Sequence, residues 1–125
     1  MSRVAAFLAA LVLSAISQTA AAQTQLELNQ QATRKLALAN NDLHELQDKI
    51  AARLTPPSAA SFAMVQRAWA TYRDAQCTFE GMDTVGGSIH GMVVTDCKTR
   101  LTLQRVKDLD AQTKCPEGNL ACIHR

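Results

Sequence analysis

Two cysteines on either side of a glycine-containing break place the strongest constraint on how this chain can fold. Cys77 and Cys97 flank a segment that contains Gly86, Gly87 and Ser88, and apolar residues recur at helical spacing on both sides of it. This arrangement predicts two helices that are joined by a short loop and connected by a disulfide bond. A disulfide in turn indicates an oxidising compartment.

The cysteine count also limits how the chain is cross-linked. All four cysteines lie in its second half, at Cys77, Cys97, Cys115 and Cys122. An even number in a short exported chain is typical of a disulfide framework, and four cysteines permit three pairings. We favour Cys77 with Cys97 and Cys115 with Cys122, because each pair brackets turn residues: Gly81, Gly86 and Gly87 in the first, Pro116 and Gly118 in the second.

The first 22 residues have the features of a secretory signal peptide. A basic Arg3 precedes the apolar run Val4–Leu13, and small residues at 20–22 precede the polar Gln23. The apolar run is shorter than the roughly 20 residues that span a bilayer. We therefore expect residues 1–22 to be removed after Ala22, and residues 23–125 to act in the periplasm or outside the cell without stable insertion in a membrane.

Length and charge indicate one small domain that does not bind nucleic acid. A chain of this size falls in the usual range for a single domain. The formal net charge is +2, and loss of Arg3 with the signal peptide lowers it by one. A nucleic-acid binder is expected to carry a strong basic patch, which a nearly neutral chain does not suggest.

Hydrophobic periodicity predicts three helices. Residues 23–54 form the first, and prolines at 56 and 57 stop it. Its apolar stripe contains Leu28, Ala32, Leu36, Ala39, Leu43, Leu46, Ile50 and Leu54. Residues 58–80 form the second helix, whose stripe contains Phe62, Val65, Trp69, Tyr72, Gln76 and Phe79.

The third helix covers residues 89–113, with a stripe of Ile89, Met92, Val93, Cys97, Leu101, Val106 and Leu109. Residues 114–125 form an irregular tail held by the second disulfide. No segment shows sustained period-two alternation, so no sheet is predicted. The fold class is therefore all-α: a small three-helix bundle in which the first helix packs on a disulfide-pinned helical hairpin.

The motif in the second and third helices resembles the LprI-type lysozyme inhibitor family of small exported helical proteins. The similarity lies in the order and spacing of Trp69, Tyr72, Arg73, Asp74, Cys77, Gly87, Ser88, Cys97, Thr102 and Arg105. The segment Thr24–Asn29 followed by Ala32 is similar to that family's opening helix. The resemblance implies a structural role for Trp69, Tyr72, Thr102 and Arg105, and it implies lysozyme inhibition.

Two features depart from the family pattern. Its members often carry a cysteine in the first helix, where this chain has none and instead has the pair Cys115 and Cys122 at its end. The lysozyme-inhibiting lipoprotein that gives the family its name is membrane-anchored, whereas no cysteine lies near the expected cleavage site of this chain. The resemblance therefore supports the predicted fold more directly than it supports lysozyme inhibition.

Arg73 and its neighbours allow two interpretations. Arg73 could offer a bidentate fork to a carboxylate on a partner protein. Alternatively, Arg73 and Asp74 pair within the molecule or lie on its surface, and Trp69 and Tyr72 belong to the core. We favour the second interpretation.

The glycine-containing segment 82–88 also has two compatible roles. It could insert into the cleft of an enzyme, with Asp83, Gly86, Gly87, Ser88 and His90 as partner contacts, because a braced loop loses little entropy on binding. It could equally be a tight turn in which the Ser88 hydroxyl caps the next helix. We favour the turn and cap as its structural role.

Catalytic, metal and cofactor sites are not expected. The histidines, His44, His90 and His124, are not spaced as metal ligands, and the cysteines lack a C-x-x-C half-site. Ser88 and His90 are close in sequence but lack the context of a nucleophile elbow. We therefore expect no enzyme and no cofactor.

The leading hypothesis is a non-catalytic helical protein of the periplasm or exterior that inhibits a lysozyme by occluding its cleft. The alternative is a structural or adaptor protein of the cell envelope that binds another protein through its first helix. The position of an exposed apolar patch, at the loop end of the hairpin or along the first helix, would distinguish the two.

Overall fold

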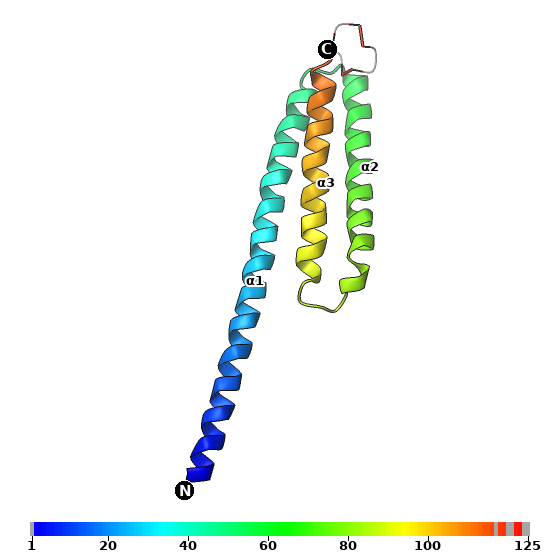
Figure 1. The fold of residues 1–125 in the computed structure, drawn as a ribbon. Helices are drawn as coiled ribbons and strands as arrows, with labels where there is room; N and C mark the ends of the chain where they lie inside the picture. The colour runs from blue at the N-terminus through cyan, green and yellow to red at the C-terminus, as the bar shows by residue number, and fades with distance from the viewer. Residues whose placement is uncertain (1, 117, 120–121, 124–125) are drawn as a thin grey trace.

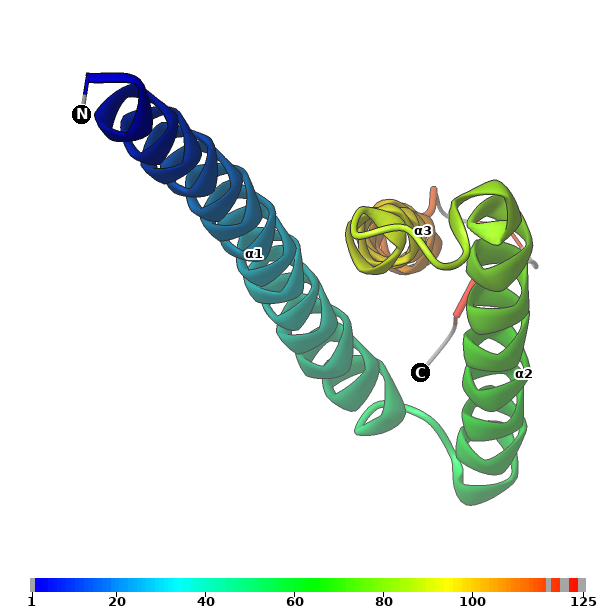
Figure 2. The same cartoon turned by 90° about the horizontal axis from the view of Figure 1, so that it is seen from below.

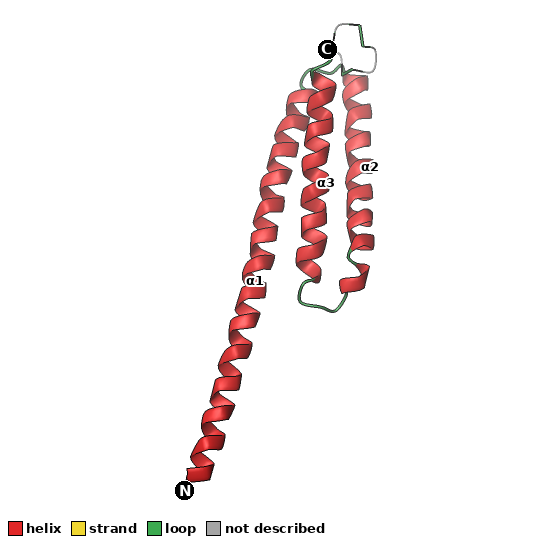
Figure 3. Cartoon of the chain, viewed as in Figure 1, coloured by secondary structure: helices red, strands yellow, loops and turns green. Residues whose placement is uncertain are grey.

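The part of the chain that the structure describes forms three long helices and one short 3-10 helix. The computed structural model describes residues 2–116, 118–119 and 122–123, with side chains from residue 24 onward. Its elements in chain order are α1 (Ser2–Ala51), α2 (Pro56–Glu80), η1 (Met82–Thr84) and α3 (His90–Thr113). The described part of the chain contains no strand, as predicted (Figure 3).

The helices form a bundle in which α3 packs between the other two (Figure 1). α1 and α3 run in the same direction, and α2 runs antiparallel to both. Figure 2 shows that α1 and α2 spread apart from the connection that joins them. The N-terminal part of α1 extends beyond the loop that joins α2 to α3 (Figure 1). The predicted all-α bundle with a helical hairpin is confirmed.

α1 contains the predicted first helix within a longer one. It begins at Ser2 and ends at Ala51, three residues before the predicted end, and turns follow in which Arg53 donates to Ile50 and Leu54 donates to Ala51. Cleavage after Ala22 stays a prediction. The stripe is confirmed where α1 meets the bundle, at the buried residues Ala32, Ala39, Leu43 and Ile50.

α2 begins earlier than predicted and turns a different face to the bundle. Pro56 and Pro57 occupy its first turn, where a missing N–H costs nothing, so they start this helix as well as end the previous one. The predicted core positions Val65, Tyr72 and Phe79 are instead 50, 56 and 68% exposed. The predicted positions Phe62, Trp69 and Gln76 do turn inward, and they are joined by three residues outside the predicted stripe: Gln66, Arg73 and Cys77.

The core lies mainly between α1 and α3. Leu43, Ile50 and Leu109 are almost fully buried and form its centre. The partly buried side chains packed against this centre come from all three helices and from the tail: Leu46, Leu54, Phe62, Trp69, Val106 and Ile123. Among the described residues, no helix combines the length and the apolar character needed to cross a membrane.

Both predicted disulfides are present. The Cα atoms of Cys77 and Cys97 lie 5.5 Å apart and join α2 to α3, and those of Cys115 and Cys122 lie 6.0 Å apart and close the tail. The backbone N–H of Ile123 donates to the carbonyl of Gln112 at 3.2 Å. The tail therefore folds back onto the end of α3.

Candidate functional site

Arg73 links all three helices through its guanidinium group. From α2, its Nη1 donates to Asn40 Oδ1 on α1 and to Thr102 Oγ1 on α3, both at 3.1 Å. Its Nε donates to Asp74 Oδ1 at 3.0 Å, and its side chain is 14% exposed. The guanidinium is thus committed to partners within the molecule, which supports the intramolecular interpretation over a free recognition fork.

Two cationic side chains lie close to the ring of Trp69. The guanidinium carbons of Arg73 and Arg105 lie 5.3 and 5.8 Å from its ring centroid, which is within the range of cation–π attraction. Nε and Nη2 of Arg105 donate to Gln66 Oε1 at 3.2 and 3.1 Å. Burial lowers the pKa of the Arg105 guanidinium, and the charge of Asp108 opposes that shift.

Three of the four residues to which the family motif implies a structural role therefore meet in one network between the helices: Trp69, Thr102 and Arg105. Tyr72 does not take part in this network, and more than half of its side chain is exposed. The interpretation of Tyr72 as a core residue was wrong, since α2 is rotated relative to its predicted face. Asn40 and Gln66, which complete the network, are ordinary polar residues with no distinctive spacing.

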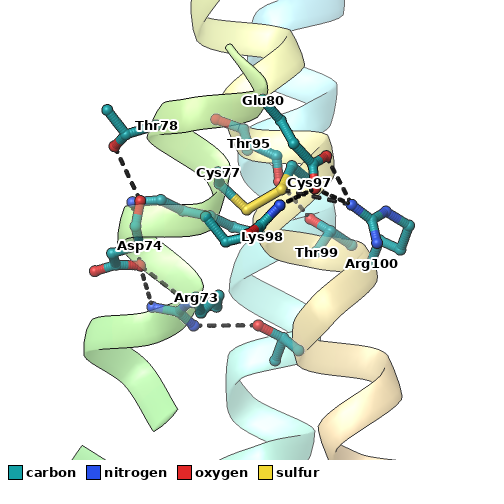
Figure 4. Close-up of a disulfide and its surroundings, with 12 residues drawn as sticks. Arg73, Asp74, Cys77, Thr78, Glu80, Thr95, Cys97, Lys98, Thr99 and Arg100 are labelled. Carbon is teal, nitrogen blue, oxygen red and sulfur yellow. Dashed lines mark hydrogen bonds and ion pairs between the residues drawn. A yellow bond between two sulfur atoms is a disulfide. The ribbon is translucent and has the colours of Figure 1, made fainter. Parts of the chain in front are cut away.

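Asp74 stands at the outer edge of this network. Its Oδ1 lies 3.0 Å from Arg73 Nη2 and 3.4 Å from Lys98 Nζ (Figure 4). Burial raises the pKa of the Asp74 carboxyl, but the hydrogen bonds and charges of Arg73 and Lys98 outweigh it and hold this pKa below its usual value. Asp74 is therefore anionic at neutral pH and connects α2 to α3.

The disulfide and an ion pair brace the base of the hairpin loop. Cys77 and Cys97 are both buried, and beside them Arg100 Nη2 donates to Glu80 Oε1 and Oε2 at 2.9 and 2.7 Å (Figure 4). A hydrogen bond from Gln76 and the contact with Arg100 lower the pKa of Glu80. The last turn of α2 is thus tied to α3 by a covalent and an ionic link.

The loop itself is ordered by its own backbone. The N–H of Thr84 donates to the carbonyl of Gly81, and the N–H of Gly87 donates to the carbonyl of Thr84, both at 3.0 Å. The N–H of His90 donates to the carbonyl of Gly87 at 3.2 Å. Gly86 adopts a φ of 83°, a backbone conformation that is strained in residues with a side chain. The predicted glycine turn is therefore confirmed at this position.

His90 contributes to the inside of the loop. Its Nδ1 lies 3.0 Å from Thr84 Oγ1 and 3.2 Å from the Gly81 carbonyl oxygen, and Thr84 Oγ1 donates to that same carbonyl at 2.7 Å. A Cβ on Gly81 would lie 2.6 Å from Val94 Cγ2, so this position has no room for a side chain. His90 is half-buried, and its role as a partner contact stays a prediction.

The predicted cap at Ser88 is wrong. α3 begins after Ile89, which takes the N-cap position, and no side-chain hydrogen bond caps the helix. Ser88 instead uses its carbonyl, which accepts a hydrogen bond from Asn29 Nδ2 on α1 at 3.3 Å. This contact ties the loop to the first helix and leaves the Ser88 side chain exposed.

The surface of the loop is more apolar than its glycines suggest. Met82, Val85 and Ile89 are 61, 71 and 42% exposed, and we name these three residues the loop apolar cluster. Asp83, Gly86, Gly87 and Ser88 are exposed around them. The sequence pattern does not indicate this cluster, because Ile89 falls in the predicted core stripe of the third helix and the side chains at 82 and 85 are not among the expected partner contacts.

Outside the loop, an open groove of about 370 Å³ lies beside the network, between α1 and α2. It is lined by Asn40, Leu43, His44, Gln47, Gln66, Arg67, Trp69, Ala70 and Arg73. Within the described residues, no three histidine, cysteine or acidic side chains are grouped so that they could hold a metal ion. His124 lies outside the described residues.

Comparison with known proteins places these features in a family. The model of a family described as lysozyme inhibitor LprI matches residues 16–109, about three quarters of the chain. The chain belongs to the LprI lysozyme inhibitor family. The matched region holds the Trp69 network, the first disulfide and the loop apolar cluster, so the features described above lie in the part of the chain that defines LprI membership. The description of this family names lysozyme inhibition.

One curated relative shares a shorter region. An uncharacterised protein of Rhizobium meliloti (strain 1021) is 46% identical over 44 residues, which make up 35% of this chain and 32% of that protein. The matched region thus spans about a third of the relative's length. No solved structure matches this LprI chain significantly.

Proposed function

We propose that this protein is an exported, non-catalytic lysozyme inhibitor that occludes the substrate cleft with its α2–α3 loop. LprI membership supports lysozyme as the target, and the signal-like segment 1–22 supports a periplasmic or secreted location. The observation that carries the proposal is the loop apolar cluster, three exposed apolar side chains on one braced loop. Exposed apolar groups that cluster mark interaction surfaces.

The loop is suited to occlusion because it is ordered before it binds. The Cys77–Cys97 disulfide, the Glu80–Arg100 ion pair and the hydrogen bonds of Thr84 fix its shape. A loop that is already ordered loses little conformational entropy on association, so more of the contact energy remains as affinity.

Occlusion also requires no catalytic group in the inhibitor. A lysozyme holds two carboxylates on either side of the bond that it cleaves, and any protein segment that fills the space between them excludes the glycan. Met82, Val85 and Ile89 would supply apolar contact area. Asp83 and Ser88, which are exposed beside them, would meet polar groups at the rim of the cleft.

The alternative, an adaptor that binds through α1, has less support. From residue 24 onward, where the structure describes side chains, the large exposed apolar residues of α1 are Leu26, Leu28 and Leu38. At about 100° per residue they lie roughly 80 to 160° apart around the helix, so they do not form a stripe. The apolar surface at the loop therefore favours the loop as the contact.

The test is a muramidase assay with the oxidised protein, purified after export, against chicken-type and goose-type lysozymes. We expect dose-dependent inhibition of at least one type by the wild type, and Val85→Asp to weaken it at least about tenfold by burying an unpaired charge. Leu38→Asp is the matched control, because Leu38 is 66% exposed on the outer face of α1. We expect it to inhibit like the wild type.

Two outcomes would contradict the proposal. If the protein at micromolar concentration inhibits neither lysozyme, it is not a lysozyme inhibitor of the proposed kind. Equal inhibition by Val85→Asp and the wild type, with unchanged helical content, would mean that another surface makes the contact.

A further inference from the structure

α2 carries an apolar seam on the face that the bundle does not cover. The seam residues follow one another in steps of three, four, three and four: Val65, Ala68, Tyr72, Ala75 and Phe79. All five are exposed, and the three large ones are exposed by half or more. This is the spacing at which one helix packs along another.

Nothing in the described chain covers this seam. α2 meets α3 through its opposite side, where Arg73 and Cys77 make their contacts. Figures 1 and 2 both show α2 at the edge of the bundle, with no other element beyond it. An apolar stripe of this length that remains in water is a sign of an interface.

The chemistry of the seam indicates its partner. The residues that flank it on α2, Met64, Thr71, Gln76 and Thr78, carry no charge, and neither does the seam. An acidic or basic partner would find no complementary charge there. A second copy of the same helix would meet an uncharged surface without like-charge repulsion.

We propose that two copies of this protein associate through the seam, with their α2 helices antiparallel. An axis level with residue 70 would set Tyr72 against Ala68 of the other copy and Val65 against Ala75. Each large side chain then meets a small one, as good packing requires. A parallel pair would set Phe79 against Phe79 and Ala75 against Ala75. The two large side chains would crowd each other, and the two small ones would leave a gap.

The size of the seam is consistent with a weak, reversible dimer. A fully exposed aromatic side chain presents roughly 150 to 250 Å², and Tyr72 and Phe79 expose more than half of theirs. With Val65 and the alanines, the pair of seams would bury on the order of 1,000 Å², the lower limit for a specific interface. We therefore expect a reversible dimer with a Kd of about 10 μM.

The dimer would leave the inhibitory surface free. The seam shares no residue with the loop apolar cluster, and antiparallel helices place the two loops at opposite ends of the pair. At 1.5 Å per residue each loop begins roughly 18 Å from the axis. The inference is thus independent of the proposed inhibition, and either can fail without the other.

The test is sedimentation equilibrium of the oxidised protein purified after export, from about 1 to 200 μM, a range that brackets the expected Kd. We expect the wild type to move from monomer to dimer mass, and Tyr72→Glu to raise the Kd at least about tenfold. Leu38→Glu is the matched control and should dimerise like the wild type, because Leu38 is as exposed as the seam residues but lies on α1. Far-UV circular dichroism checks that each variant keeps its helices.

A second pair of substitutions tests the antiparallel arrangement. Val65→Lys and Ala75→Glu should each weaken the dimer, and the double variant should recover most of the lost affinity, because each lysine then faces a glutamate of the other copy. These residues are too far apart along α2 to pair within one helix. A wild type that stays monomeric at 200 μM, or a Tyr72→Glu variant that dimerises unchanged, would overturn the dimer. Failure of the double variant to recover would overturn its antiparallel form.

Discussion

Single polar residues hold the helices of this bundle in register. Thr102 is fully buried in the middle of α3, where an apolar residue would be the usual choice. Its hydroxyl accepts a hydrogen bond from Arg73 Nη1, which supplies the partner that a buried polar group needs. The Thr102 side chain therefore stabilises the fold only as long as Arg73 reaches it.

Replacing Thr102 with valine should reveal this dependence. Thr102→Val keeps the shape of the side chain but removes the acceptor, so one N–H of Arg73 loses its partner. We expect the free energy of unfolding in urea to fall by about 1 to 3 kcal/mol. Thr99→Val is the control, because Thr99 Oγ1 donates only to the carbonyl of Thr95 in its own helix. An equal decrease in the free energy of unfolding in both variants would mean that the hydrogen bond between Thr102 and Arg73 contributes no more to stability than the hydrogen bond of Thr99 within its own helix.

At the scale of helices, apolar periodicity predicted α1 better than α2. On α1 the predicted stripe and the buried face coincide at Ala39, Leu43 and Ile50. On α2, Tyr72 and Phe79 belong to the predicted stripe but lie in water. Periodicity shows that a helix has an apolar face, but it does not show whether that face meets the core or another molecule. On α2 the buried face includes Gln66 and Arg73, which a hydrophobic pattern does not select.

The covalent link between α2 and α3 was predictable because turn residues lie between the two cysteines. It should also contribute most to the stability of the hairpin. Replacing Cys77 and Cys97 together with serine should lower the free energy of unfolding by about 3 kcal/mol, since the bridge closes a loop of 20 residues. Thermal unfolding followed by circular dichroism should show a Tm at least about 10 °C lower.

The second disulfide provides the comparison for that experiment. Replacing Cys115 and Cys122 with serine opens a loop of only 7 residues in the tail, and we expect a loss of about 2 kcal/mol or less. A larger loss of Tm in this variant than in the Cys77→Ser/Cys97→Ser variant would show that the tail, and not the hairpin, limits the stability of the protein.

For the molecule as a whole, the position of the candidate site could be predicted but its surface could not. Glycines between paired cysteines predicted a braced loop, and Gly86 and the disulfide confirm it. The exposure of Met82 and Val85 is a property of the folded loop that no local sequence pattern encodes. The inward position of His90 likewise depends on Thr84 and Gly81, which meet it only in the folded loop.

The linked charges of Arg73, Asp74 and Lys98 make the stability of the whole bundle depend on pH. The pKa of Asp74 is lower in the folded protein than its usual value, which is near 3.9 in an unfolded chain. A carboxyl group whose pKa is lowered by folding stabilises the fold fully at pH values above its pKa in the unfolded chain. This stabilisation is lost as the pH falls through its pKa in the folded protein. Because the side chain is 51% exposed, the contribution should be about 1 kcal/mol or less.

Asp74→Asn tests this link. The variant should be less stable than the wild type at pH 7, because it loses the ion pairs that join α2 to α3. The difference should shrink as the pH falls below about 4, and it should vanish once the pH is below the lowered folded-state pKa of Asp74, where the wild-type carboxyl is protonated too. Urea unfolding at pH 7, 5, 3 and 2 measures it. A difference that stays constant across this range would arise from hydrogen bonding or packing of the side chain, and the charge of Asp74 would then have no part in holding the helices together.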